Sequence, residues 1–462
     1  MSHPTVFRRK SIEWAKSLAE EEGHRLRREL GPVPLFFYTI GAVIGAGIFV
    51  LPGTVAAHDA GPAVPFSFLI GGIVTLAVAL MYVEFASLVP VAGSAYTYTY
   101  VSLGEIFAWI VGWDLIFEFT VIVATVAVGW SGYVNSLFHA MGFPLGEALT
   151  HNPFEGGVAN LLAALGVSFV AAISLRGIRL VGQVSEGLTW LKLLAILTFL
   201  GVGIAHVRPE NWHPFLPFGW EGVLRGAALT FFAYTGFDGV TAVLEEVKNP
   251  ERTIPRVLLS AILTIVALYV GVAAVLTGVV PFTHLDVPNP VAFAFREMGL
   301  PVGEGLIALA ILFGLLATML ANGTNGSRIL FAMGRDGLLP ELLGRVHPTT
   351  RTPYVAESFV FGTAALLATF FPVHTLAELA NIGGLSAFFL TTLSVLVLRV
   401  TRPDAVRPFR VPAVWLVGLV GLAGTATLIA SLPWVTFVRF GVWLLIGLVV
   451  YAAYGFRHAR AG

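Results

Sequence analysis

Residues 40 to 53 read Ile40-Gly-Ala-Val-Ile-Gly-Ala-Gly-Ile-Phe-Val-Leu-Pro-Gly53, an apolar stretch with glycine at positions 41, 45 and 47. Glycine weakens a helix, and its missing Cβ atom lets another group approach the backbone. The stretch therefore predicts a helix that is interrupted near Gly45. Gly41 and Gly45 also have the four-residue spacing that lets two helices pack closely. Taken alone, the stretch is compatible with a packing motif as well as with a functional interruption.

The composition around this stretch is that of a membrane protein. Of the 462 residues, 56% are hydrophobic and 12% are charged, and the mean hydropathy is +0.84. Soluble domains carry about 25% charged residues. The apolar runs have about twenty residues, which is the length that a helix needs to cross the hydrocarbon of a bilayer. They lack the alternation of transmembrane β-strands, so we expect an all-α integral membrane protein in a lipid bilayer.

The same composition excludes several classes of function. The formal net charge is zero and no long basic tract occurs, so nucleic acid is not an expected partner. The absence of cysteine rules out disulfides and thiol chemistry, and the histidines lack the spacing of metal ligands. No set of nucleophile, base and acid can be assembled from the chain. We therefore expect no enzyme activity, no metal, no cofactor and no obligatory protein partner.

Apolar runs and loop signals together predict twelve transmembrane helices. Their ranges are 33–56, 63–89, 104–137, 157–175, 182–206, 220–246, 257–281, 303–333, 354–371, 374–399, 411–430 and 434–456. An even number of spans places both ends of the chain on one side of the membrane. Arginine and lysine are concentrated before the first span and in the even-numbered connections, whereas the odd-numbered connections contain little besides Arg208 and Arg296. Under the positive-inside rule both termini are cytoplasmic, in a multi-pass protein of the cell membrane.

The two ends of the chain are polar. Residues 1–32 form a mixed-charge leader that lacks the apolar core of a signal peptide. We expect either a cytoplasmic amphipathic segment or a disordered tail in this leader. Residues 457–462 are expected to form a short cytoplasmic tail.

A second interruption lies in the sixth span, which reads Phe231-Phe-Ala-Tyr-Thr-Gly-Phe-Asp-Gly239. It follows the first by five spans, and this odd separation reverses the direction in which the two spans cross the membrane. Residues 33–206 and 220–399 would then form a 5+5 inverted repeat that is followed by two helices in 411–456. The repeat is inferred from topology, since the two halves share no convincing residue-level similarity. Interrupted helices at corresponding places are the best sequence indication of a transporter's binding site.

The interruptions also indicate which ligand would fit. Backbone groups that are freed within hydrocarbon must line a cavity or meet a ligand. Amide groups at Ala46 and Gly47, at the start of a second half-helix, can receive a carboxylate with help from the helix dipole. Carbonyl groups near Val43, Phe232 and Thr235 can accept hydrogen bonds from an α-ammonium group. The expected ligand is a free α-amino acid, and the pair of interruptions favours a substrate site over packing alone.

Lys192 lies in the middle of the predicted span 182–206, in a chain with only three other lysines. A charged side chain at the centre of a membrane helix costs about 2.5–3.5 kcal/mol, so by default it marks a functional site. The alternative is a lysine that extends its ammonium group to the membrane interface. This alternative is the weaker one, because roughly ten residues of helix, about 15 Å, separate Lys192 from either end of the span.

The motifs of the chain resemble those of the amino acid-polyamine-organocation superfamily and, within it, the cationic amino acid transporter family. The resemblance covers residues 31–412. It rests on residues 40–53 and on Pro90-Val-Ala-Gly-Ser-Ala-Tyr-Thr-Tyr-Thr-Tyr-Val-Ser-Leu-Gly-Glu105, Phe231-Phe-Ala-Tyr-Thr-Gly-Phe-Asp238, Glu245-Glu246, Asn249-Pro250, Met333-Gly-Arg-Asp-Gly-Leu-Leu-Pro340, Asn381-Ile-Gly-Gly and Arg402-Pro-Asp-Ala-Val-Arg-Pro-Phe-Arg-Val-Pro412. It implies ten core helices in two inverted halves, two peripheral helices and amino acid uptake by alternating access.

The resemblance also implies roles for individual residues. Phe232 matches an aromatic gate over the substrate. Lys192 matches a lysine of proton-coupled members, whose ammonium group occupies the cation site that sodium-driven relatives have between spans one, five and eight. A hydroxyl group of span eight should face it; we select Thr318, and Ala317 would take this place if the register differs by one residue. For Glu118 in span three the resemblance implies proton coupling, and the alternative is a structural acid that is bonded to backbone amides.

Asp238 either gates or reads the substrate side chain, or it caps the half-helix that follows it. The candidate substrate-binding residues are Val43, Ile44, Gly45, Ala46, Gly47, Phe231, Phe232, Thr235 and Asp238. The candidate proton-coupling residues are Lys192, Glu118 and Thr318.

The sequence thus predicts a secondary active amino acid transporter, with proton symport as the leading mechanism. Protonated Lys192 would hold spans one, five and eight together, and a change in its protonation would bias the direction in which the site opens. Two alternatives are an amino acid exchanger in which Lys192 is a fixed surrogate cation and a receptor that binds without transport. A small neutral substrate such as alanine is favoured over a cationic one, because only Asp238 and Glu378 offer acids at a suitable depth.

Overall fold

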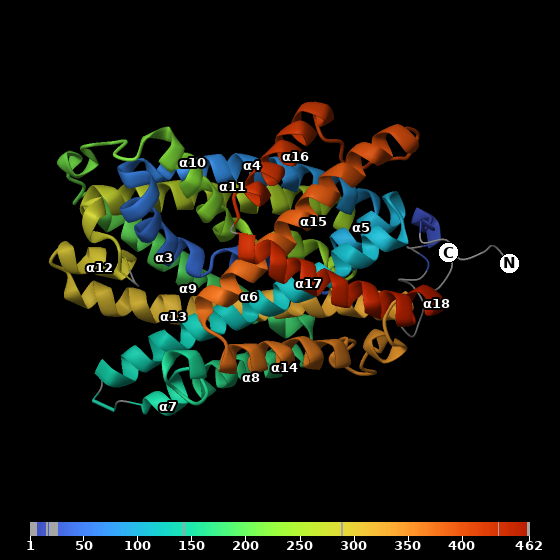
Figure 1. Ribbon diagram of the computed structural model, residues 1–462, viewed down its shortest axis with the longest axis horizontal. Helices are drawn as coiled ribbons and strands as arrows, with labels where there is room; N and C mark the ends of the chain where they lie inside the picture. Colours follow the sequence, from blue (N-terminus) through green and yellow to red (C-terminus); the bar gives the residue numbers. More distant parts are fainter. Residues whose placement is uncertain are drawn as a thin grey trace.

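The computed structural model describes residues 7–14, 17, 26–140, 142–143, 145–287, 290–432 and 434–459, and the regular structure in these ranges is helical. The α-helices are α2 (Pro32–Val43), α3 (Ala46–Val55), α4 (Val64–Leu88), α5 (Ala95–Ser102), α6 (Glu105–Ala140), α7 (Glu147–Thr150), α8 (Leu161–Ser174), α9 (Ile178–Ile204), α10 (Gly219–Thr230), α11 (Pro250–Val279), α12 (Pro290–Glu297), α13 (Pro301–Arg335), α14 (Tyr354–Phe370), α15 (Val373–Thr401), α16 (Val414–Ala430), α17 (Trp434–Val450) and α18 (Phe456–His458). Figure 1 shows an elongated bundle with α5 and α18 at one end and α7 and α12 at the other. The prediction of an all-α chain is confirmed.

Many of these helices are apolar enough to lie in a membrane. Among the described residues, seven stretches have the length and hydropathy of a membrane span: Leu51–Leu88, Glu105–Asn135, Ile178–Ile204, Pro250–Val279, Gly305–Arg335, Ile382–Thr401 and Trp434–His458. Shorter apolar helices are α2, α8, α14 and α16. Each of the twelve predicted ranges contains a helix. The architecture is consistent with a multi-pass membrane protein.

Several helix boundaries differ from the predicted ones. Helix α11 begins at Pro250 rather than at residue 257, because Asn249-Pro250 places a proline at the first helical position, where its missing N–H group costs nothing. Helices α5 and α12 lie in connections and were not predicted, since hydropathy detects only long apolar runs.

The first interruption lies where the glycine pattern predicts it. Helix α2 ends at Val43, and Ile44 leaves the helical conformation with φ −72° and ψ 90°. Gly45 is extended, with φ −121° and ψ −146°, and α3 begins at Ala46. The chain therefore presents the carboxyl end of one helix and the amino end of another within a few residues.

The second interruption is longer than the sequence predicts. Helix α10 ends at Thr230 and is followed by the 3₁₀ turn η5 (Phe231–Tyr234). Thr235 is extended, and Gly236 has a φ of +96°, a conformation that favours glycine. The chain then continues through the 3₁₀ turns η6 (Asp238–Thr241) and η7 (Leu244–Glu246). The expected helix over 220–246 is therefore α-helical only as far as Thr230.

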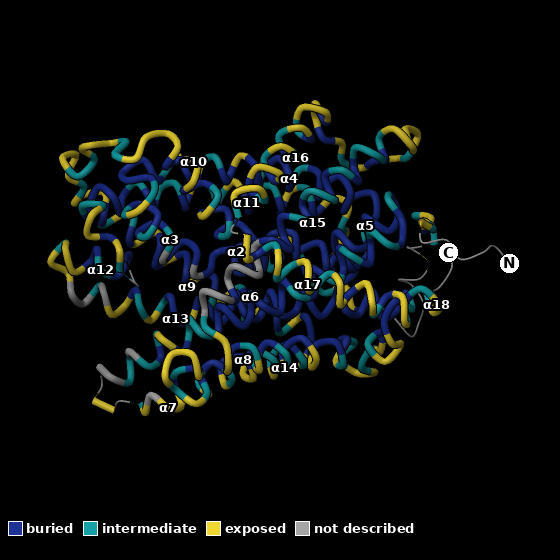
Figure 2. The backbone as a smooth tube through the Cα atoms, viewed as in Figure 1, coloured by how far each residue is buried: buried dark blue, intermediate teal, exposed yellow. Residues whose placement is uncertain are grey.

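Both interruptions lie in the buried interior. The tube in Figure 2 is mostly dark blue along α2, α6 and α15, whereas α7 and the loops at the ends of the bundle are exposed. Helix α13 packs against α6, α9 and α2, and α11 packs against α4 and α2. Any site at the interruptions is therefore enclosed by long helices on several sides.

Candidate substrate and coupling site

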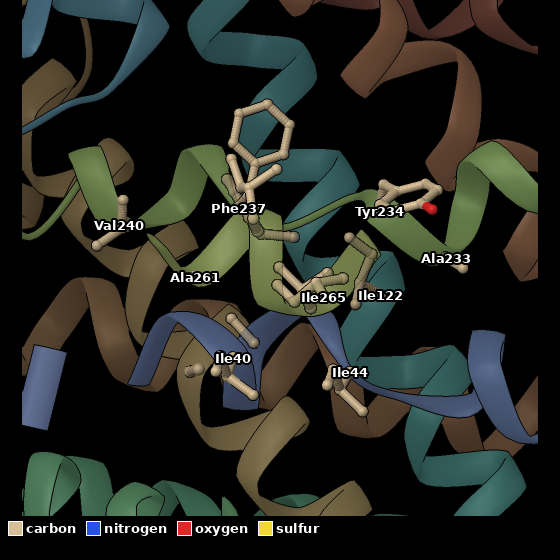
Figure 3. Packing of buried hydrophobic residues seen from close by; sticks show 14 of the residues in the cluster. Ile40, Ile44, Ile122, Ala233, Tyr234, Phe237, Val240, Ala261 and Ile265 are labelled. Atoms are coloured by element: carbon tan, nitrogen blue, oxygen red, sulfur yellow. The ribbon is translucent and has the colours of Figure 1, made fainter. Parts of the chain in front are cut away.

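The two interruptions are in direct contact. A Cβ atom added to Gly47 would lie 2.7 Å from both the Cα and the Cβ atom of Ala233. In Figure 3 the segment with Ile40 and Ile44 runs below the segment that carries Ala233 and Tyr234. Residues almost 190 positions apart in the chain are thus in contact, and the missing side chain of Gly47 is what permits the approach.

Tyr269 of α11 connects the same two segments. Its hydroxyl group lies 2.8 Å from the carbonyl oxygen of Ala233 and 3.3 Å from that of Val43. Tyr269 is fully buried. Sequence reasoning missed this residue, because a single tyrosine in an apolar helix has no local signal for such a contact.

Backbone groups at the interruptions remain available to a ligand. Gly45, the N-cap of α3, provides no side-chain cap, and the amides in the first turn of a helix have no partner within it. These amides lie at the positive end of the helix dipole, where a carboxylate is stabilised. The side chain of Ala46 lies outside the described residues.

The carbonyl groups expected to bind an ammonium group are partly occupied. The carbonyl oxygen of Val43 is within reach of Tyr269, and that of Phe232 accepts hydrogen bonds from the amide of Thr235 at 3.2 Å and from its hydroxyl group at 2.9 Å. A carbonyl oxygen has two lone pairs, so Val43 retains room for a second donor. Thr235 itself is extended, which turns its backbone out of the helical hydrogen-bond pattern.

The packing interpretation of Gly41 and Gly45 also holds. A Cβ atom at Gly41 would lie 2.6 Å from the hydroxyl oxygen of Thr189, and one at Gly45 would lie 3.2 Å from the methyl carbon of Thr318. Gly41 thus admits α9, Gly45 admits α13, and Gly47 admits the second interruption. The three glycines serve three different neighbours, so packing and the site are parts of one arrangement.

Lys192 points into this arrangement. Its side chain is 1% exposed, and its Nζ atom lies 3.2 Å from the carbonyl oxygen of Gly41 and 3.1 Å from the hydroxyl oxygen of Thr318. It also donates to the carbonyl oxygen of Ile44. These carbonyls belong to the last turn of α2, where the helix dipole favours a cation. The ammonium group lies inside the bundle, which is not the place of a lysine that extends to the interface.

Space for Lys192 comes from a glycine of α13. A Cβ atom at Gly314 would lie 2.8 Å from the Cε atom of Lys192. One turn further along α13, the hydroxyl group of Thr318 lies 2.9 Å from the carbonyl oxygen of Gly41 and 3.2 Å from that of Ile44. Helices α2, α9 and α13, which lie in the predicted spans one, five and eight, therefore meet at the Lys192 ammonium group.

Two asparagines of α13 continue this contact and were missed by sequence reasoning. The amide group of Asn322 donates to the carbonyl oxygen of Ala42 at 3.1 Å. The side-chain oxygen of Asn325 accepts from the hydroxyl group of Tyr38 at 2.5 Å. Their three-residue spacing on an apolar helix was the available signal, because polar side chains within a membrane helix face the protein interior.

Glu118 and Asp238 are fully buried acids. Both side chains are 0% exposed, and among the described residues neither carboxyl group is hydrogen-bonded to another side chain. The two groups are within electrostatic reach of each other, and Asp114 is within reach of Glu118. The backbone amides of Gly236, Asp238 and Gly239 lie close to the Asp238 carboxyl group, so the capping and gating roles of Asp238 both stay predictions, as do the two roles of Glu118. Asp238 is an electrostatic neighbour of Glu118 and is not among the hydrogen-bond partners of Lys192.

Buried ion pairs occupy the end of the bundle that carries α5. Arg328 of α13 is fully buried and donates to Glu246 at 2.9 and 3.0 Å, and it also contacts Glu357 of α14. Arg335 pairs with Glu245 at 2.9 Å. These pairs tie the segment after the second interruption to α13 and α14.

Replacing Gly47 by alanine is expected to reduce transport by roughly tenfold or more, because small displacements of binding groups cost large factors in rate. The new Cβ atom would meet the backbone of Ala233 at 2.7 Å, and backbone cannot give way as a flexible side chain can. Uptake into proteoliposomes at equal protein content measures the effect. Gly187→Ala is the matched control, since nothing lies within 4 Å of its added Cβ atom. Equal uptake by the two variants would contradict the proposed contact.

Comparisons with known proteins agree with this architecture. The profile of a protein family described as amino acid permease matches residues 30–454. The branched-chain amino acid permease BcaP of Bacillus subtilis (strain 168) is 44% identical over 465 residues, which cover 99% of both chains. The methylthioribose transporter of the same organism is 40% identical over 457 residues, with 98% of this chain and 99% of the relative covered. The vacuolar cationic amino acid transporter 4 of Arabidopsis thaliana is 34% identical over 409 residues, or 87% and 68% of the two chains.

The helical architecture and these matches define a multi-pass membrane transporter rather than an enzyme. Two findings identify its family: the match to the family profile and the sequence identity to full-length relatives. The chain belongs to the amino acid permease family. The resemblance drawn from the sequence motifs is thus confirmed.

Proposed function

We propose that the protein carries α-amino acids across the cytoplasmic membrane by alternating access. The observation that supports this most is the contact between the two interrupted segments at Gly47 and Ala233. It brings the uncapped amino end of α3 next to the chain after α10, so that amides and carbonyls converge on one place. A zwitterion supplies a partner to both kinds of group.

The proposed topology has twelve transmembrane helices and cytoplasmic termini. Residues 33–206 and 220–399 form the two inverted halves, residues 411–456 form two peripheral helices, and 1–32 and 457–462 are the cytoplasmic ends. The concentration of arginine in the even-numbered connections supports this orientation.

The proposed substrate is a small neutral amino acid such as alanine. Ile44, Gly45 and Gly47, together with Phe231, Phe232 and Thr235, surround the proposed site and are mostly apolar. Asp238 is enclosed near Glu118, so we propose that it does not bind a cationic side chain. The side chain of Glu378 lies outside the described residues. The names of the relatives add branched-chain amino acids, cationic amino acids and methylthioribose as competitors to be tested.

The proposed driving force is a proton gradient. Lys192 has the carbonyl groups of α2 and the hydroxyl group of Thr318 as partners, which is a suitable place for a cation that holds three helices together. Glu118 is buried and has no hydrogen-bond partner in the part of the chain that the structure describes, which supports a role in carrying the proton. An exchanger in which Lys192 keeps its proton throughout is the alternative mechanism.

Transport by purified protein in proteoliposomes tests this function. Labelled alanine should accumulate when an inward proton gradient is imposed, and unlabelled alanine should compete more strongly than arginine, leucine, glutamate or methylthioribose. Counterflow without a gradient should occur in a symporter and in an exchanger, so only gradient-driven accumulation separates them. Binding without counterflow would indicate a receptor. Glu118→Gln is expected to keep counterflow and to lose accumulation; loss of both would assign Glu118 a structural role.

A further inference from the structure

The part of the leader that the structure describes is bound to the helix bundle. Lys10 is 5% exposed, and its Nζ atom lies 2.5 Å from the carboxylate of Asp336, just beyond α13. The same ammonium group lies 4.2 Å above the ring of Tyr100 and 4.5 Å above that of Trp14. Burial lowers the pKa of Lys10 to about 8, while the Asp336 carboxylate opposes this shift. At neutral pH the ammonium group therefore still carries its proton, and the ion pair is intact.

Arg8 makes a second attachment, to the start of α6. Its Nη2 atom lies 3.1 Å from the carboxylate of Glu105, and its Nε atom donates to the same group. The amide of Glu105 donates to the carbonyl oxygen of Arg8 at 3.0 Å. Glu105 is fully buried and also accepts hydrogen bonds from Tyr100 at 2.6 Å and from Tyr451 at 2.7 Å. Glu105 thus binds both the side chain and the backbone carbonyl group of Arg8.

Gly104 makes room for this attachment. Its φ is +112°, and an added Cβ atom would lie 2.8 Å from the carbonyl oxygen of Phe7. The ring of Phe7 lies 6.2 Å from that of Phe107 of α6. A residue with a side chain at position 104 would both strain the turn and displace the leader.

These groups form a site for a basic peptide, which we call the leader site. Its members are Tyr96, Tyr100, Gly104, Glu105, Asp336 and Tyr451. They come from α5, α6, the end of α13 and the π-turn η10 (Tyr451–Gly455) at the end of α17. The two carboxylates are held by tyrosine hydroxyl groups and face two basic side chains of the leader. Helices α5 and α18 lie at the end of the bundle where α13 ends (Figure 1).

The leader is attached a second time, directly before α2. The amides of Glu29 and Leu30 both donate to the carbonyl oxygen of Glu246 at 2.9 Å, and the amide of Lys248 donates to that of Leu30 at 2.9 Å. Leu30 is 1% exposed. The carboxylate of Glu246 is in turn bonded to Arg328. The leader therefore joins α6 and α13 to the segment after the second interruption, at the point where α2 begins.

We propose that the leader site binds residues 7–14 as a peptide ligand, and that this binding keeps the α5 end of the bundle closed. The proposal rests on alternating access as the function. A substrate path at this end requires α2 to move away from α13, and the leader, bound on both sides of the gap, opposes this movement. The binding is reversible, because ordering an extended segment costs conformational entropy and burying its charged groups costs desolvation, and together these costs offset much of the gain from two ion pairs.

Tethering the leader in its site tests the proposal directly. The chain has no cysteine, so Phe7→Cys with Phe107→Cys creates the only thiol pair. A short bifunctional methanethiosulfonate reagent should join the two thiols, reduce alanine counterflow to background, and lose this effect when a reductant is added. Each single variant, treated in the same way, is the control. Full counterflow by the joined protein, or failure of the two thiols to react as a pair, would overturn the proposal.

Weakening the leader site should have the opposite effect. In a Leu35→Cys background, the new thiol on the buried face of α2 reports opening at this end through its reaction with a membrane-impermeant maleimide. Lys10→Glu should raise the reaction rate by roughly tenfold, as expected for a tenfold gain in the open population, whereas Lys10→Arg should not. Combining Lys10→Glu with Asp336→Lys should restore the slow rate. Equal rates in all four proteins would overturn the proposal.

These tests separate the leader from the transport function. If no substrate shows counterflow in the parent protein, the proposed function fails, while the maleimide reaction still reports whether the leader controls opening. If counterflow is normal and the joined protein is unaffected, only the leader proposal fails.

Discussion

Lys192→Met is expected to abolish gradient-driven amino acid accumulation. Methionine fills a similar volume but has no charge, so the carbonyl groups of Gly41 and Ile44 and the hydroxyl group of Thr318 would lose their shared donor. Thr318 would still bond the end of α2, but the proposed proton-dependent contact between α2, α9 and α13 would be lost. Uptake into proteoliposomes with an imposed pH gradient measures the effect.

Lys248→Met is the matched control, because Lys248 is exposed, two residues before α11, and the substitution is chemically the same. We expect it to leave accumulation unchanged. If Lys192→Met retained full pH-dependent accumulation, the ammonium group would have no part in coupling, and the proposed mechanism would be wrong. Loss of accumulation with retained counterflow would support symport most directly.

Arg328→Met is expected to lower the free energy of unfolding by about 3–5 kcal/mol, the usual cost of removing one partner from a buried ion pair. Arg328 is fully buried and is the common partner of Glu246 and Glu357. Its removal would leave the buried carboxylates of Glu246 and Glu357 without this cation, and of the ion pairs described above only Arg335–Glu245 would still join the segment after the second interruption to α13. Denaturant unfolding of the detergent-purified protein measures the change.

Arg225→Met provides the comparison for this experiment. The Arg225 side chain is 52% exposed and pairs with Glu221 at 3.3 Å, so its loss should change the free energy of unfolding by only about 0–1 kcal/mol. If both variants unfold at the same denaturant concentration, the buried network does not stabilise the fold. A large loss for Arg328→Met alone would show that this end of the bundle is held by its ion pairs.

The first interruption was predictable because its signal is local. Gly41 and Gly47 each stand where a neighbouring helix or segment leaves no room for a Cβ atom, and at Gly45 a Cβ atom would be tightly packed against α13. Lys192 was identifiable for the opposite reason, since a lone charge in an apolar run is costly whatever surrounds it. Thr318 followed from the resemblance to a known family, not from the pattern of its own helix.

Other parts could not be predicted, because their signal exists only in three dimensions. Tyr269 gains its meaning from two carbonyl groups on separate segments. The loss of α-helix after Thr230 depends on Gly236 and on contacts with α13, such as that between Gly239 and Asn325. Lys10, in a mixed-charge leader, has the pattern of a solvated residue, and only the tertiary structure shows it to be buried.

Tyr269 has a consequence for how the two interrupted segments can influence each other. One hydroxyl proton lies within reach of the carbonyl oxygens of Val43 and Ala233, so it can satisfy one fully only at the expense of the other. A ligand that moves one of these carbonyl groups away from Tyr269 would leave the hydroxyl proton to the other carbonyl group. Binding at one segment is therefore expected to strengthen the hydrogen bond of Tyr269 to the other segment, which would link the two segments reciprocally without the movement of a whole helix.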